Sequence, residues 1–125
     1  MDKKKILIVD DDQKICETLA DILEEAGYEV STACDGQNAL EKIRLDSFNL
    51  VITDIKMPIM DGMALLKEIE KSHANIEVIV ITSYGYQGQQ VEATRLGAYE
   101  YLSKPLNLDQ LKNIIARVLQ MQETK

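Results

Sequence analysis

Acidic side chains follow two of the short apolar runs in this sequence. Asp10 and Asp11 come directly after the run Lys5–Val9, and Asp54 comes directly after Asn49–Thr53. Neighbouring carboxylates repel one another, so a cluster of them costs free energy unless a cation compensates the charge. Mg²⁺ typically binds one or two carboxylates, keeps several waters and shares its remaining sites with phosphate oxygens. The acids therefore indicate a site for a hard divalent cation.

Two polar groups of a different kind follow two other apolar runs. Thr82 comes after Glu77–Ile81, and Lys104 lies just beyond Ala98–Leu102. An ammonium group and a hydroxyl suit an anion, because a metal that already balances the acids needs no cationic neighbour. That anion can be a phosphoryl group carried by a carboxylate. Asp12 has a simpler explanation, since aspartate is favoured as the N-cap of a following helix.

Short apolar runs alternate with stretches of helical periodicity along the whole chain. The runs are rich in Ile, Val and Tyr, as buried strands are. The predicted strands are Lys5–Val9, Tyr28–Ala33, Asn49–Thr53, Glu77–Ile81 and Ala98–Leu102. Apolar helical faces are predicted within Ile15–Ala26, which Gly27 ends, and within Ala39–Ile43, Leu65–Ile69, Val91–Leu96 and Leu108–Val118, the last opened by Asn107 and Gln110 as a capping pair.

This alternation predicts a parallel sheet, because each helix is a crossover that returns the chain to the same edge. We expect a single α/β domain over residues 1–121, with five parallel strands and helices on both faces. Residues 122–125 are expected to be a flexible tail or the start of a linker. Since ligands of open α/β sheets bind beyond the carboxyl ends of the strands, the acids, the hydroxyl and the lysine should share one pocket.

Composition limits the classes of function. The 125 residues suit one domain, and 14 Lys and Arg against 21 Asp and Glu give a net charge of −7. A negative domain is a poor partner for nucleic acid. No segment approaches the length of apolar chain that a membrane span needs, so no membrane contact is expected. Cys16 and Cys34 fit neither a disulfide framework nor a metal motif and are typical of reduced thiols in a cytoplasmic protein.

Four motifs resemble those of a known family. VDDD after the first predicted strand, TDIKMPIMDG around Asp54, ITSYG at the fourth strand and YLSKP after the fifth are similar to the receiver domain of two-component response regulators. The resemblance covers essentially the whole chain. It implies a flavodoxin-like (βα)5 fold with strand order 2-1-3-4-5.

The resemblance also implies roles for the acids. Asp54 is expected to accept a phosphoryl group from a phosphohistidine on a sensor histidine kinase or a histidine phosphotransfer protein. Asp10, Asp11, Asp54 and the backbone carbonyl of Lys56 are expected to bind Mg²⁺, with Mn²⁺ as an alternative ion. Such a domain is a phosphoacceptor regulator, not an enzyme with a separate substrate, although it promotes its own phosphorylation and dephosphorylation.

Other roles follow from the same resemblance. Lys104 is expected to pair with the phosphoryl group and to form a cis peptide bond with Pro105. Thr82 is expected to be the switch hydroxyl, and Tyr101 the aromatic residue that turns inward when Thr82 moves toward the phosphoryl group. A tyrosine also packs well in a half-buried edge strand without any such function.

The remaining expectations concern kinetics and partners. The side chains of Lys56 and Tyr84 are expected to tune the lifetime of the phosphoryl group. The region from Gln87 to Met121 is the expected output surface for a downstream domain or protein, and a phosphorylation-dependent homodimer is compatible with it. The kinase or phosphotransfer protein is expected to dock beside the pocket, against Ile15, Leu19 and Pro105.

Two other classes of protein remain open at this point. An aspartate-nucleophile phosphatase is one, since Asp10 and Asp12 form a DxD motif, but Gln13 stands where that class usually places Thr or Val and the chain is short for it. A flavodoxin-like nucleotide or flavin carrier is the other, but no glycine-rich phosphate loop follows the first strand. Neither the cognate kinase nor the output partner follows from the sequence.

Overall fold

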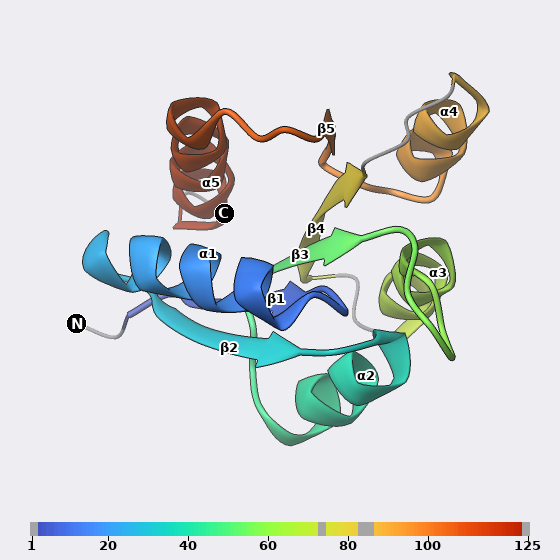
Figure 1. Cartoon of the computed structure of the whole chain (residues 1–125), viewed down its shortest axis with the longest axis horizontal. Helices are drawn as coiled ribbons and strands as arrows, with labels where there is room; N and C mark the ends of the chain where they lie inside the picture. Colours follow the sequence, from blue (N-terminus) through green and yellow to red (C-terminus); the bar gives the residue numbers. More distant parts are fainter. Residues whose placement is uncertain (1–2, 73–74, 83–86, 124–125) are drawn as a thin grey trace.

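The computed structural model describes residues 3–72, 75–82 and 87–123 of the chain. Strands and helices alternate from one end to the other (Figure 1). The elements are β1 Lys5–Val9, α1 Gln13–Glu25, β2 Glu29–Ala33, α2 Gly36–Leu45, β3 Leu50–Asp54, α3 Gly62–Ser72, β4 Glu77–Thr82, α4 Gln87–Arg95, β5 Glu100–Ser103 and α5 Leu108–Glu123.

All the strands pair in parallel, in the order β2-β1-β3-β4-β5, which confirms the predicted fold. The register aligns the strand ends that carry the polar residues. Val9 pairs with Thr53, so Asp10 and Asp54 stand at the same level on adjacent strands. Thr82 pairs with Ser103, which places Lys104 one residue beyond that pair.

Alternating residues of each central strand divide the core into two layers. On one face, Leu7, Val51 and Val78 pack with the helices α2, α3 and α4. On the other face, Ile8, Ile52 and the neighbouring strand residues pack with α1 and α5. Figure 1 shows α1 and α5 together on one side of the sheet and α2 and α3 on the other. Burial on both faces explains the uninterrupted apolar runs in the sequence.

Local signals fix the helix ends. The Asp12 side chain accepts hydrogen bonds from the backbone N–H groups of Lys14 at 3.0 Å and Ile15 at 3.3 Å, so Asp12 is the N-cap of α1. Asn107 caps α5 through the Gln110 N–H at 3.0 Å. Gly27 follows α1 with φ of 103°, a conformation that glycine adopts without strain.

Two boundaries differ from the prediction by two residues, and the other strand ends differ by at most one. β5 begins at Glu100, two residues later than expected, because Ala98 still donates its N–H to Ala93 O at the end of α4 and Gly97 has φ of 100°. The helix α5 continues to Glu123 and so includes two residues that were expected to belong to the tail. None of the helices in the described ranges is both long enough and apolar enough to cross a bilayer.

Candidate functional site

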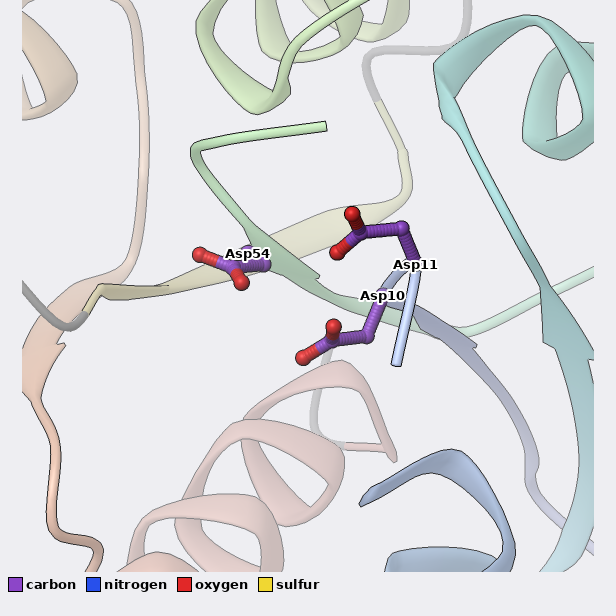
Figure 2. Close-up of side chains that lie close together, drawn as sticks. All are labelled: Asp10, Asp11 and Asp54. Carbon is purple, nitrogen blue, oxygen red and sulfur yellow. The ribbon is translucent and has the colours of Figure 1, made fainter. Parts of the chain in front are cut away.

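Three carboxylates meet at the carboxyl end of the sheet. One oxygen each from Asp10, Asp11 and Asp54 lies within 4.8 Å of the other two. Figure 2 shows the three side chains projecting to the same side of the strand ends. Asp10 is buried, with 5% of its surface exposed, whereas Asp54 is half-buried and Asp11 is exposed. The cluster therefore faces solvent on one side only.

The three consecutive acids after β1 have different local roles. Asp10 extends the strand, since its N–H donates to Ala33 O at 3.1 Å. Its Oδ1 accepts the Asp12 N–H at 2.9 Å, which holds the carboxylate at the strand end. Asp12 caps α1 and is not one of the three clustered acids. Asp11 is left exposed between them.

Lys104 joins the two deepest acids of the cluster. Its Nζ lies 3.3 Å from Asp10 Oδ2 and 3.3 Å from Asp54 Oδ2. Its backbone N–H donates to Thr82 O at 2.8 Å, and its peptide bond with Pro105 is cis. The sequence predicts an anion as the partner of Lys104, and in the structure its Nζ contacts the carboxylates that would carry or surround that anion.

The charges of this cluster are only partly compensated. Burial raises the pKa of Asp10, and the Asp54 carboxylate adds to this, while the Asp12 N–H and Lys104 act in the opposite direction without cancelling it. Burial lowers the pKa of Lys104, but the attraction of Asp10 and Asp54 outweighs burial and leaves the pKa raised. A second cation would favour the ionised form of Asp10. The donor set of three carboxylate oxygens open on one side thus fits a hard divalent ion such as Mg²⁺.

Asp54 is held at both of its carboxylate oxygens. Oδ1 accepts the N–H of Ile55 at 2.7 Å, and Oδ2 contacts Lys104. The carbonyl oxygen of Asp54 accepts the Thr53 hydroxyl at 2.8 Å. These contacts fix a half-buried carboxylate that retains access to the open side of the cluster, as a nucleophile requires.

Three other predicted site residues lie in the part of the chain that the structure describes. Thr82 is buried and follows Ile81, the residue that pairs with Asp54 in the sheet. Tyr101 is half-buried and packs against the core layer that contains α3 and α4. The side chain of Lys56 is exposed in the β3–α3 loop. Tyr84 lies outside the described residues.

Two glycines shape the β3–α3 loop and were not identified from the sequence. Gly62 donates its N–H to Ile55 O at 2.8 Å, and a Cβ at Gly62 would press against Asp54 O. Gly36 donates its N–H to Met60 O at 3.0 Å, and a Cβ there would lie 2.7 Å from the same oxygen. Each of these glycines directly follows an aspartate that accepts a backbone N–H of the helix, Asp35 from Asn38 and Asp61 from Ala64, and this Asp-Gly pattern is a signal that could have drawn attention to them.

An apolar groove of about 300 Å³ opens beside the acid cluster, between α1 and the segment that follows β5. Its lining includes the predicted docking residues, and the full set is Lys14, Ile15, Thr18, Leu19, Lys104, Pro105 and Leu106. Lys104 belongs both to the groove and to the acid cluster, so the two features are continuous.

Comparison with known proteins agrees with this geometry. The family model described as response regulator receiver domain matches residues 6–116. The transcriptional regulatory protein ZraR of Escherichia coli K12 is 42% identical over 118 residues, which are 94% of this chain and 27% of that protein. The chain thus spans about a quarter of the length of such curated relatives.

Solved structures show the same fold. A CheY-like receiver domain protein from Methanospirillum hungatei JF-1 superposes with a TM-score of 0.95 at 38% identity, covering 98% of both chains. The response regulator TrrA from Thermotoga maritima, solved in complex with Mg²⁺-BeF, has a TM-score of 0.84 at 36% identity and covers 92% of this chain and 98% of its own.

Fold and site together define a signalling domain of the receiver type. The chain belongs to the response regulator receiver domain family of two-component systems. This membership decides against the phosphatase and the flavin or nucleotide carrier that the sequence left open.

Proposed function

We propose that Asp54 accepts a phosphoryl group from a phosphohistidine on a sensor histidine kinase or a histidine phosphotransfer protein. The observation that carries the proposal is the cluster itself: three carboxylate oxygens within 4.8 Å, with Lys104 bound to Asp10 and Asp54. An Asp54 oxygen attacks phosphorus in line, the phosphorus–nitrogen bond breaks, and its electron pair returns to the imidazole of the donor. The product is an acyl phosphate, which water can hydrolyse.

The surrounding groups stabilise charge, which is the main requirement of phosphoryl transfer. The carboxylates of Asp10, Asp11 and Asp54 and the backbone carbonyl of Lys56 would hold Mg²⁺, and Mn²⁺ is the alternative ion. When bound, this ion supplies positive charge to the phosphoryl oxygens. The Lys104 ammonium can move from the Asp10 and Asp54 carboxylates to a phosphoryl oxygen, because all of these groups lie at the carboxyl ends of the strands.

Intact mass after incubation with Mg²⁺ and acetyl phosphate tests the proposal. The wild type is expected to gain one phosphoryl group, and Asp54→Asn is expected to gain none, because it keeps the shape of the side chain and lacks the nucleophile. Omission of Mg²⁺ should also prevent the gain. A labelled Asp54→Asn protein, or a wild type that takes no label from acetyl phosphate or from any of a panel of autophosphorylated kinases, would contradict the assignment of Asp54.

The same assay, continued after the donor is removed, tests the residues proposed to set the lifetime of the acyl phosphate. Lys56 is exposed in the loop that follows Asp54, where its side chain can reach over the phosphoryl group. We propose the same role for Tyr84. Lys56→Ala and Tyr84→Ala are expected to change the rate of mass loss, and rates equal to that of the wild type would remove both from this role.

The output signal is proposed to pass through α4, β5 and α5, from Gln87 to Met121. Thr82 is the last residue of β4, which pairs with β5, and the half-buried Tyr101 lies on β5 within this surface. Their joint rearrangement would shift a population between two packings. Downstream recognition, by an output domain, another protein or a second phosphorylated copy, would read the change.

Hydrogen exchange of the phosphorylated and unphosphorylated protein tests this path. Changes in protection are expected in residues 87–121 and at the end of β4, while β2, the edge strand opposite β5, should keep its protection. Tyr101→Ala is expected to reduce the changes in α4 without preventing phosphorylation. Identical exchange in both states would exclude this surface as the output.

The donor protein is proposed to dock in the groove formed by Ile15, Leu19 and Pro105. The position of this groove supports the proposal, since an apolar groove continuous with the acid cluster offers contact area beside the nucleophile.

We further propose that this domain does not bind nucleic acid, because its net charge is negative. A cytoplasmic location follows from the proposed kinase partner.

A further inference from the structure

Two backbone hydrogen bonds hold the loop between β3 and α3. The N–H of Gly62 donates to Ile55 O at 2.8 Å, which closes the loop on itself. The N–H of Gly36, at the start of α2, donates to Met60 O at 3.0 Å and ties the loop to a second helix. Little freedom remains between these two bonds, so the loop presents a defined surface.

The tip of this loop has a strained backbone. Met60 donates its N–H to Pro58 O at 2.7 Å, and the three residues form a γ-turn centred on Ile59, whose φ is 69°. Within the described part of the chain, Ile59 is the one residue other than glycine with positive φ. This form of γ-turn is rare and strained, and a β-branched side chain increases the strain. Glycine or asparagine would adopt the same turn more easily.

The side chain of Ile59 adds nothing to the core that would offset this strain. It is 78% exposed, whereas Met57 and Met60 on either side pack against the core layer of α2 and α3. An apolar, β-branched residue is thus kept at a position where both its backbone and its exposure are unfavourable within the isolated domain. Strain of this kind is commonly retained at sites of binding.

The position of Ile59 limits what it can contact. Ile59 is three residues before Gly62, so the two Cα atoms are at most about 11 Å apart, and Gly62 packs on the carbonyl group of Asp54. A protein interface of standard size covers about 800 Å² on each partner, a patch of roughly 16 Å radius. An interface of this size that is centred on Asp54 therefore reaches the tip of this loop.

We propose that Ile59 is a contact residue for the protein that donates the phosphoryl group, and that the γ-turn presents its side chain to the donor. This inference rests on the proposed function of Asp54. The loop leads toward α3 on one face of the sheet, and the apolar groove lined by Ile15 and Leu19 lies at α1 on the other face (Figure 1). A donor seated over Asp54 would meet apolar side chains on both sides and should carry an apolar surface around its histidine.

Phosphorylation by two donors tests the proposal. One donor is acetyl phosphate, and the other is an autophosphorylated sensor kinase fragment, chosen from a panel as the one that transfers fastest to the wild type. Ile59→Asn is expected to lose about tenfold in kcat/KM with the kinase and to match the wild type with acetyl phosphate. Ile59→Gly, which also relieves the turn, is expected to behave in the same way, and neither variant should unfold at a lower temperature than the wild type.

Leu45→Asn is the matched control. Leu45 is 88% exposed at the end of α2. It precedes Asp46, which binds Lys5 at the amino end of β1, whereas Asp54 lies at the carboxyl end of β3. Its transfer from the kinase should equal that of the wild type. Equal kinase transfer to Ile59→Asn and the wild type would overturn the proposal, as would an equal loss with both donors. Loss of a phosphorylation-dependent dimer in Ile59→Asn with normal transfer would assign the residue to a second copy instead. No label on the wild type from either donor would instead reject the function of Asp54.

Discussion

Gly62→Ala is expected to take up phosphoryl groups from acetyl phosphate at least ten times more slowly than the wild type. In other active sites, misplacement of a reacting group by 1 Å can lower the rate about 10²-fold. A Cβ at residue 62 would overlap Asp54 O and would lie 2.9 Å from the Cα of Ile55 and 3.0 Å from the carbonyl carbon of Asp54. These are backbone atoms, so no side chain can rotate away. The backbone that carries the nucleophile has to move.

The same overlap should lower stability. Overpacking of a tight contact costs about 1–3 kcal/mol, which for a domain of this size lowers Tm by about 3–6 °C for each kcal/mol. Thermal unfolding and the initial rate of mass gain measure the two effects separately. A Gly62→Ala protein with wild-type values of both would show that the loop relaxes without moving Asp54.

Gly27→Ala separates loss of stability from displacement of the site. Gly27 has φ of 103°, and no atom lies within 4 Å of the place that an alanine methyl group would occupy, so alanine there is strained but meets nothing. Its cost is about 1–2 kcal/mol, similar to that of Gly62→Ala, and it lies at the end of α1 away from the acids. Gly27→Ala should therefore unfold earlier and still be phosphorylated at the wild-type rate.

Gly62 also marks the limit of what the sequence could predict. Hydrophobic periodicity was sufficient to predict the order of strands and helices. A strand of a parallel sheet is buried on both faces, so its sequence is an apolar run such as Lys5–Val9. The rule that ligands bind at the carboxyl ends of parallel strands was sufficient to bring Asp10 and Asp54 together. Both inferences depend on patterns of residue type, which a single sequence contains.

Close approaches between segments were not predictable in the same way. The contact of Gly62 with Asp54 depends on the path of a loop, and the φ of Ile59 contradicts the preference of isoleucine. The contact of Lys104 with two carboxylates depends on side-chain rotamers and on charge balance at the strand ends. Such features follow from tertiary geometry, and local sequence preferences carry little information about them.

Lys104→Met is expected to be destabilised in the absence of Mg²⁺ and to recover most of the loss when Mg²⁺ is added. Nζ of Lys104 lies 3.3 Å from both Asp10 Oδ2 and Asp54 Oδ2, and its side chain is only partly exposed. Removing it leaves two largely buried carboxylates without their cation, at a cost of about 1–3 kcal/mol. Mg²⁺ should therefore raise the Tm of this variant more than that of the wild type.

The pH dependence of the variant follows from the pKa shifts. The pKa of Lys104 is raised, so its contribution to stability is present at neutral pH and is lost only above its ordinary pKa of 10.5. The pKa of Asp10 is also raised, so Asp10 becomes neutral earlier on acidification than an ordinary carboxyl. The difference in Tm between the wild type and Lys104→Met should therefore shrink as the pH falls from 7 toward about 4.

Lys5→Met is the matched control, because Lys5 also binds two acids but lies at the amino end of β1, away from the acid cluster. Its Nζ is 2.7 Å from Asp46 Oδ1 and 3.5 Å from Glu29 Oε2, and both acids are exposed, so these ion pairs contribute little. Mg²⁺ should raise its Tm by the same amount as that of the wild type. An equal effect of Mg²⁺ on Lys104→Met and Lys5→Met would mean that the ion does not bind among Asp10, Asp11 and Asp54. A larger effect on Lys104→Met alone would place the ion where the lysine charge was removed, because only there do the two cations compensate the same carboxylates.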